Sequence, residues 1–318
     1  MRRYAILFAV VSLLLPVVTA FSQTRTPEAA LNHFNNAVKK LGTGDLDGAI
    51  EDYTRAITLS SSFAPTAKNN RSANSFSNNS DTATDDVRII DPFTANAYTN
   101  RGLARYRKGD FDGAIKDFTL ALEIRPGLGT AYLNRAAALR ANGDTEAAMK
   151  DLDRAISMNK DFQEAYSNRG SLYLDLGDHE AAIADLNRAI KLNDRVAETF
   201  YQRGYAYLAT KSFDAAILDF NCAIKLAPNM AWAYQGRGTA YMHKGAMLEA
   251  IEDFSRALQH DELAWAYFNR GLAKVYLGDE SEARKDFDEC LRLRPDLKEQ
   301  LDSKIDLARH LRRIGKSE

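Results

Sequence analysis

The stretch Tyr98-Thr99-Asn100-Arg101-Gly102 decides the fold, because it returns along the chain at a fixed interval. It reappears as YLNRA at 132–136 and as YSNRG at 166–170, each time 34 residues later. Related stretches begin at residues 200, 234 and 267, the last after 33 residues. Self-similarity at a fixed period of about 20–50 residues is typical of repeat architectures. The sequence therefore predicts a chain of stacked, similar units.

A second pattern follows each of these stretches. In the first copy it is Gly109-Asp110, then an alanine pair seven residues apart, Ala114 and Ala121, and finally Pro126. Glycine commonly ends a helix, and aspartate can cap the start of the next one. Small residues on the second helix allow close approach, and proline ends it. Each unit is thus predicted to be a helical hairpin, which must stack on its neighbours to bury its apolar face.

The pattern resembles the tetratricopeptide repeat family. The resemblance implies an all-α fold, a right-handed α-solenoid of seven helical hairpins with a C-terminal capping helix. Two family positions differ: Arg stands at position 7, usually Leu, and Asp at position 23, usually Tyr, in six repeats. We expect these residues to pair between helices. The predicted repeats are 30–63, 95–128, 129–162, 163–196, 197–230, 231–263 and 264–297.

The N-terminal residues have the features of a cleavable signal. Arg2 and Arg3 precede a nearly uncharged apolar run, and small residues lead to Ala20. This order is typical of a secretory signal peptide. We predict a signal over 1–20 that is cut after Ala20, a tail over 21–29, and a periplasmic or secreted location. An uncleaved membrane anchor is the alternative, although Pro16 and the short run argue against it.

Two further segments interrupt or end the repeats. Residues 64–94 are rich in Asn and Ser and predict a flexible insertion. Residues 298–318 predict a capping helix and tail, with Leu301, Ile305 and Ala308 on one face. The charged residues of this helix lie largely elsewhere and are expected to solvate the end of the array. Contact of this basic helix with anionic lipid is the alternative.

The sequence contains no recognisable catalytic motif. The five histidines fall at different repeat positions, and no glycine-rich phosphate loop is present. The formal net charge of -1 lacks the basic excess of a nucleic-acid binder. We therefore predict a non-catalytic protein, with no catalytic, cofactor or metal site, no nucleic acid and no small-molecule substrate. Its expected partner is a protein or an extended peptide.

Amide side chains recur at position 6 of the repeats. The row resembles the asparagine ladder in the superhelix of O-linked N-acetylglucosamine transferases, and it implies binding of a peptide backbone by amides that face solvent. An amide offers both a donor and an acceptor to a peptide unit. Gly236 breaks the row, and the alternative is a structural amide bonded to the neighbouring helix. The ladder residues are Asn35, Asn100, Asn134, Asn168, Gln202 and Asn269.

Aromatic residues gather in the later repeats, at positions that the family resemblance places on the concave face. Exposed aromatic side chains in one strip indicate a recognition surface. The alternative is that some of them fill the seam between first helices. The alternative function for the whole array is self-assembly, in which the protein bridges subunits and binds no peptide ligand. The predicted strip consists of Tyr201, Tyr205, Trp232, Met242, His243, Trp265, Phe268 and Tyr276.

Overall fold

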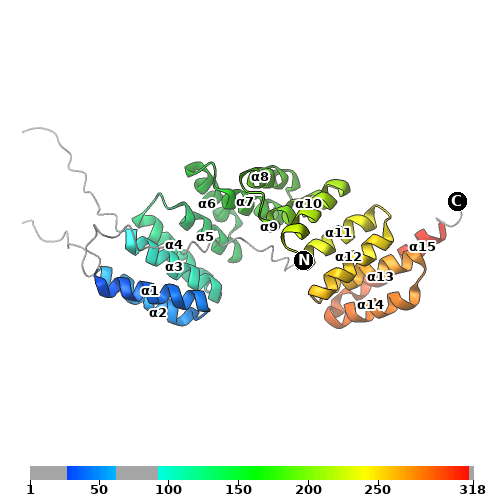
Figure 1. Ribbon diagram of the computed structural model, residues 1–318, viewed down its shortest axis with the longest axis horizontal. Helices are drawn as coiled ribbons and strands as arrows, with labels where there is room; N and C mark the ends of the chain where they lie inside the picture. Colours follow the sequence, from blue (N-terminus) through cyan, green and yellow to red (C-terminus); the bar gives the residue numbers. More distant parts are fainter. Residues whose placement is uncertain (1–26, 62–91, 315–318) are drawn as a thin grey trace, which may run out of the picture. The chain divides into compact units, whose positions relative to one another are not determined.

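The structure, a computed structural model, describes residues 27–61 and 92–314. Within these residues the chain forms α-helices and one short 3-10 helix, and no strand (Figure 1). This architecture confirms the predicted all-α solenoid of repeated hairpins. The described residues belong to two compact units, one over 27–161 and one over 162–314. The predicted signal peptide and most of the insertion lie outside the described residues.

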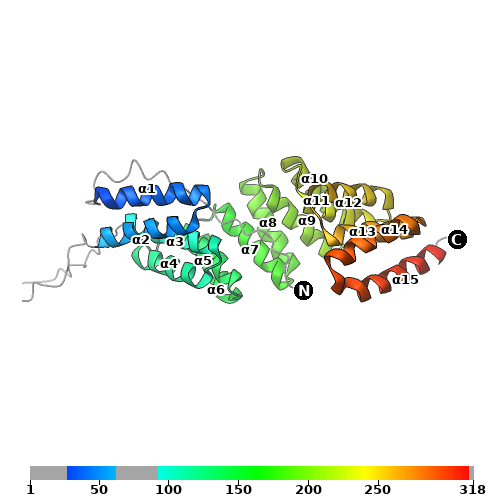
Figure 2. The same cartoon turned by 90° about the horizontal axis from the view of Figure 1, so that it is seen from below.

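The helices follow one another as hairpins of first and second helices (Figure 2). The first helices are α1 (Glu28–Thr43), α3 (Pro92–Lys108), α5 (Gly129–Ala141), α7 (Gln163–Leu176), α9 (Ala197–Ala209), α11 (Ala231–His243) and α13 (Ala264–Leu277). The second helices are α2 (Leu46–Ser61), α4 (Phe111–Ile124), α6 (Thr145–Met158), α8 (His179–Leu192), α10 (Phe213–Leu226), α12 (Met247–His260) and α14 (Glu280–Leu293). The chain continues through η2 (Pro295–Leu297) into α15 (Lys298–Ile314).

The turn inside each hairpin has a left-handed residue, and in five of the seven hairpins the aspartate that follows it caps the next helix. In six hairpins a glycine takes the positive φ, for example Gly177 at 78°. Asp178 comes next, and its side chain accepts a hydrogen bond from the backbone N–H of Ala181 at 3.0 Å. The hairpin α9–α10 differs, because Lys211 takes the positive φ of 60° there. The Gly-Asp pattern thus acts as the sequence predicts, by ending one helix and capping the next.

The hairpin interior depends on close approach of the two helices. A Cβ atom added to Gly204 on α9 would lie 3.0 Å from the ring of Phe220 on α10. Ala216 and Ala223, the alanine pair of α10, are fully buried. A larger residue in place of Gly204, Ala216 or Ala223 would collide with an aromatic ring or with the backbone of the facing helix, since protein interiors are close-packed.

In the six hairpins after the first, an arginine of the first helix pairs with an aspartate of the second helix, and Arg203 shows how this arginine can join three helices. Arg203 on α9 donates to both carboxylate oxygens of Asp219 on α10, at 2.7 and 2.6 Å. Its third nitrogen donates to Asn187 on α8, in the preceding hairpin, at 2.6 Å. The predicted Arg–Asp pairing is therefore confirmed, and the same arginine also ties neighbouring hairpins. The pairs are Arg101–Asp117, Arg135–Asp151, Arg169–Asp185, Arg203–Asp219, Arg237–Asp253 and Arg270–Asp286.

The first hairpin satisfies its aspartate differently. Asp52 on α2 lies 2.8 Å from His33 Nδ1 and 2.7 Å from Lys40 Nζ, both on α1. The hydrogen bond from Lys40 lowers the pKa of the Asp52 carboxyl below its ordinary value. A buried carboxylate thus keeps cationic or hydrogen-bonding partners even where the repeat lacks the arginine.

The second hairpin begins earlier than the sequence suggests. The composition predicts an insertion up to residue 94, whereas α3 starts at Pro92. Phe93 is fully buried, and its ring lies 5.3 Å from that of Phe34 on α1. This apolar contact between hairpins accompanies a start of α3 that lies three residues before the predicted repeat, which begins at residue 95.

Helix α15 packs on α13 at the end of the second unit. Leu301 and Ala308 are buried, and Ile305 packs against the same apolar cluster. Among residues 27–61 and 92–314, no helix combines the length and the apolar character that crossing a bilayer requires.

Candidate functional site: the first-helix face

The ladder amides differ in how far they reach solvent. Asn35, Asn100 and Asn269 are half-buried. Asn134, Asn168 and Gln202 are almost completely buried, at 3%, 1% and 1% exposure. The expectation that these amides face solvent is therefore wrong for the middle three. Position 6 of those repeats lies in protein packing and not on an open surface.

The contacts of Gln202 show what buries such an amide. Its Oε1 accepts a hydrogen bond from Ser167 Oγ on α7 at 3.2 Å. Its Nε2 donates to Glu198 Oε1, one turn earlier on α9, at 3.5 Å. Gln202 thus joins two successive first helices, as the structural alternative for the ladder predicted. By contrast, Asn134 Oδ1 is buried and accepts no hydrogen bond from the described residues.

A polar seam runs between α7 and α9. Thr199 lies 3.5 Å from Gln163 Nε2 and 3.4 Å from Ser167 Oγ, and it has no exposed surface. Sequence reasoning missed this residue, although a signal was present. Thr199 stands at repeat position 3, where the neighbouring repeats carry alanine, such as Ala165 and Ala233.

Glu198 is the acidic member of this seam. Burial raises the pKa of its carboxyl to about 7, and the hydrogen bond from Gln202 offsets part of that effect. Removal of water disfavours the charged form of a carboxyl, which explains the direction of the shift. A half-buried carboxyl of this kind on a first helix is a candidate contact for a ligand.

The gap in the ladder has a packing cause. A Cβ atom on Gly236 would lie 2.5 Å from the ring of Phe220 on α10. The aromatic ring of the preceding hairpin therefore occupies the space in which a position 6 side chain would begin. Gly236 is required by this contact, whatever the role of the other amides.

The aromatic strip divides into exposed and packed members. Trp232 on α11 is 39% exposed, whereas Phe268 on α13 is only 3% exposed and belongs to the apolar core of the last hairpin. The assignment of Phe268 to an open strip is therefore wrong, because Trp265 and α15 pack around it. The half-buried members, which pack against apolar clusters at their edges, are Tyr201, Tyr205, Met242, Trp265 and Tyr276.

His243 lies at the end of α11 and away from the middle of the first-helix face. Its ring stacks on Phe213, the first residue of α10, with centroids 5.0 Å apart and planes 5° apart. Burial lowers the pKa of this imidazole. His243 thus packs against the start of the preceding second helix, a contact that the repeat position alone did not predict.

The repeat sequences match profiles described as tetratricopeptide repeat over 95–128, 129–162, 164–195, 197–230 and 266–297. These matches together span more than half of the chain. The chain belongs to the tetratricopeptide repeat family. The hairpins α1–α2 and α11–α12 have the same architecture.

Solved structures of other proteins resemble this chain in fold. One is a tetratricopeptide repeat protein from Parabacteroides merdae, with 22% identity and a TM-score of 0.60 over 89% of this chain and 99% of that chain. Pseudomonas aeruginosa pilF matches at 19% identity and a TM-score of 0.58, over 63% and 92%. YrrB matches at 23% identity and a TM-score of 0.50, over 59% and 97%. No curated protein sequence matches significantly.

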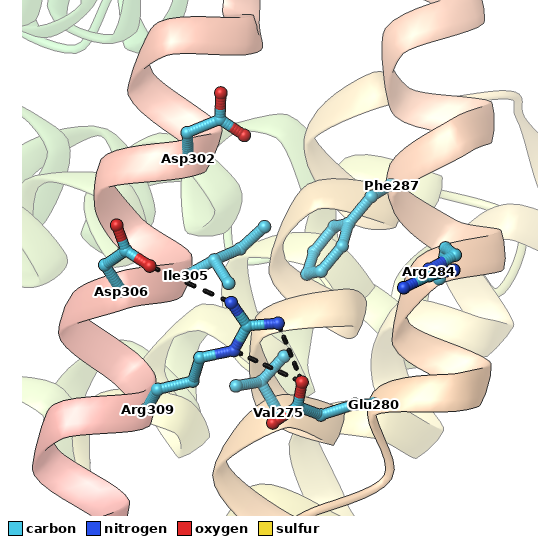
Figure 3. Close-up of a pocket in the computed structure, with 8 residues that line it drawn as sticks. All are labelled: Val275, Glu280, Arg284, Phe287, Asp302, Ile305, Asp306 and Arg309. Carbon is cyan, nitrogen blue, oxygen red and sulfur yellow. Dashed lines mark hydrogen bonds and ion pairs between the residues drawn. The ribbon is translucent and has the colours of Figure 1, made fainter.

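This tetratricopeptide repeat protein also has a cavity of about 320 Å³ where its last hairpin meets α15 (Figure 3). Arg309 on α15 contacts Glu280 on α14 at 2.7 Å, and Phe287 and Ile305 supply apolar wall. In the described part of the chain, no group of His, Cys, Asp and Glu could hold a metal ion. The cavity is lined by Val275, Glu280, Arg284, Phe287, Asp302, Ile305, Asp306 and Arg309.

Proposed function

We propose that this protein is a non-catalytic scaffold that binds an extended peptide or partner segment on the first helices of residues 162–314. One observation carries the proposal: Trp232, a large aromatic residue at the second position of α11, keeps 39% of its surface exposed. Helix α11 contacts both α9 and α13, so Trp232 lies in a continuous row of first helices. Exposed aromatic residues with polar neighbours are enriched at the centres of protein interfaces.

The polar residues beside Trp232 suit a peptide. Half-buried Gln235 lies three residues further along α11; its Oε1 is buried and accepts no hydrogen bond from the described residues, so only the rest of its amide can meet a ligand. On the neighbouring helix α13, Asn269 is half-buried and keeps part of its amide exposed. Such amides pair with a peptide backbone whatever its side chains. In support, YrrB is described as a tetratricopeptide protein with an unusual peptide-binding site.

The experiment compares two exposed apolar residues. Binding of a panel of unrelated twelve-residue peptides is measured by fluorescence polarisation for the parent chain, Trp232→Ala and Leu248→Ala. Leu248 is 70% exposed on the second helix α12, and it is the matched control. Trp232→Ala should weaken the bound peptides at least about tenfold, as for an aromatic hot spot, whereas Leu248→Ala should not. No peptide binding, or equal losses in both variants, would contradict the proposal.

The same proposal places the scaffold in the cell envelope or outside the cell. It rests on Arg2, Arg3, the apolar run and Ala20, all outside the described residues. N-terminal sequencing of the protein from its native compartment should begin at Phe21. An intact Met1 in a membrane fraction would contradict cleavage and support the anchor.

A further inference from the structure

Two glutamates on α7 and α9 occupy the repeat position that Trp232 occupies on α11. Glu164, Glu198 and Trp232 follow one another at intervals of 34 residues, and Trp265 on α13 follows after 33. Helix α9 contacts both α7 and α11, and α11 contacts α13 (Figure 1). The four residues thus stand in one row across successive first helices, acidic at one end and aromatic at the other. We call them the position 2 row.

Neither carboxylate of the row has a cationic partner in the part of the chain that the structure describes. Glu164 and Glu198 are half-buried, and neither forms an ion pair there. Glu198 accepts a hydrogen bond from Gln202 at 3.5 Å. Burial raises the pKa of Glu198 to about 7, and Arg195, in the turn before α9, is exposed and does not offset this effect. A positive charge beside such a carboxylate would favour its ionised form.

The lysine and arginine side chains of the same four helices are already paired. Each helix carries one arginine at position 7, which pairs with an aspartate of the second helix, as Arg203 does with Asp219. Lys274, the one lysine of these helices, contacts Asp286 at 2.8 Å. The first-helix face of residues 162–314 therefore has carboxylates without a cation, and no lysine or arginine of its own without a carboxylate.

The lysines of other elements that approach this face do so at its far edge. Burial lowers the pKa of the His243 imidazole, and the positive charges of Lys211 and Lys304 contribute to this effect. His243 is the last residue of α11, whereas Trp232 is the second. Eleven residues of α-helix separate them, about 16 Å along the axis. These lysines therefore do not neutralise the position 2 row.

We propose that the position 2 row selects a partner segment with basic side chains at one end and apolar side chains at the other. The basic side chains meet Glu164 and Glu198, and the apolar ones meet Trp232 and Trp265. This inference rests on the function proposed above, because it names the class of peptide that the same site takes. An acidic peptide or a nucleic acid would bring further negative charge to the two carboxylates, so the row selects against both.

The repeat geometry sets the spacing of the side chains in the segment. Packed neighbouring helices lie about 8–10 Å apart. A peptide in the polyproline II conformation advances about 9 Å in three residues and returns every third side chain to the same face. One side chain of the segment therefore meets each first helix. The expected ligand has two basic residues three positions apart, continued at the same spacing by two apolar residues.

The first test measures fluorescence polarisation of labelled twelve-residue peptides with the full chain. The probe has lysine at its second and fifth residues, leucine at its eighth and eleventh, and proline or serine elsewhere. Two matched peptides replace both lysines by glutamine or by glutamate. Each peptide is also made in reverse order, and the tighter order of the lysine peptide is used for all three. The lysine peptide should bind at least about tenfold more tightly than the glutamine peptide, and the glutamate peptide more weakly than both.

The second test changes the carboxylates. Glu164→Gln and Glu198→Gln should each weaken the lysine peptide about threefold or more and leave the glutamine peptide unchanged. Glu180→Gln is the matched control, because Glu180 is exposed on the second helix α8, and it should alter neither affinity. The double variant Glu164→Lys with Glu198→Lys should prefer the glutamate peptide, which a merely structural role of the two glutamates would not produce. Thermal melting shows whether each variant is folded.

The outcomes separate this inference from the function on which it rests. Equal affinities for the lysine, glutamine and glutamate peptides, all weakened by Trp232→Ala, would overturn the selection for basic residues and leave the peptide-binding function standing. A preference for lysine that survives both Glu164→Gln and Glu198→Gln would overturn the assignment to the position 2 row. Absence of binding by every peptide would contradict both proposals.

Discussion

Arg203 and Asp219 form a two-point ion pair between the helices of one hairpin, with the carboxylate 6% exposed and the guanidinium 18%. The guanidinium carbon also lies 5.7 Å from the centre of the Phe200 ring. One planar cation thus contacts a carboxylate, an aromatic face and the preceding hairpin, which a lysine could not reproduce.

Removing the cation of this pair should cost substantial stability. Arg203→Ala leaves the Asp219 carboxylate buried without its partner, and about 3 kcal/mol of unfolding free energy should be lost. Urea unfolding followed by circular dichroism measures the change. Arg256→Ala is the control, because its pair with Glu252 is solvent-exposed and should contribute under about 1 kcal/mol. Equal losses of unfolding free energy in the two variants would show that burial does not increase the contribution of the Arg203–Asp219 pair to stability.

The left-handed turn at Lys211 offers a stabilising change. Six hairpins place glycine at this point, and Lys211 adopts a φ of 60° that is costly for a residue with a Cβ atom. Lys211→Gly should raise the thermal midpoint and add up to about 1 kcal/mol, partly offset by the entropy of glycine in the unfolded chain. Gly245→Ala, the reverse change in the next hairpin, should lower it. A fall in stability for Lys211→Gly would show that the lysine side chain makes a needed contact.

Phe268 should behave as a core residue although its repeat position suggested a ligand contact. It is 3% exposed, so Phe268→Ala should reduce the unfolding free energy by about 3–5 kcal/mol. Trp232→Ala should reduce it by less than Phe268→Ala does, because 39% of the Trp232 surface is exposed and less apolar area is buried there. Thermal melting of the two variants under identical conditions makes the comparison. A larger loss of stability in Trp232→Ala than in Phe268→Ala would show that Trp232 is the core residue and Phe268 the surface residue.

The amide ladder should separate into structural and ligand-facing members. Gln202→Ala removes hydrogen bonds in a buried seam, so it should lower stability by about 1 kcal/mol or more and leave peptide affinity per folded molecule unchanged. Asn269→Ala should do the reverse, with affinity falling roughly two- to tenfold for many unrelated peptides. Melting and peptide binding are measured on both variants. Unchanged affinity in Asn269→Ala would end the peptide-backbone reading of the ladder.

The repeat period and the hairpin chemistry were readable from the sequence, because they depend on local rules. Gly177 and Asp178 act through the turn in which they stand, and Gly204 is small because a ring follows at a fixed distance in the same repeat. The Arg–Asp pairing was also predictable. The arginine and the aspartate depart from the family pattern together and stand sixteen positions apart in one hairpin. Each charge needs a partner when it is buried, and the other residue is the nearest one of opposite charge.

Side-chain exposure was decided by the tertiary structure. Position 6 is buried at Gln202 and half-buried at Asn269, because Ser167 of the preceding first helix meets Gln202. Phe268 and Trp232 share an aromatic character, but α15 and Trp265 pack around Phe268 and leave Trp232 open. Leu307, Leu311 and Ile314 on α15 are likewise exposed although they are apolar, which a rule that buries every apolar residue of a helix does not predict. The sequence determines which residues a helix face carries, whereas contacts with other helices determine which of those faces water still reaches.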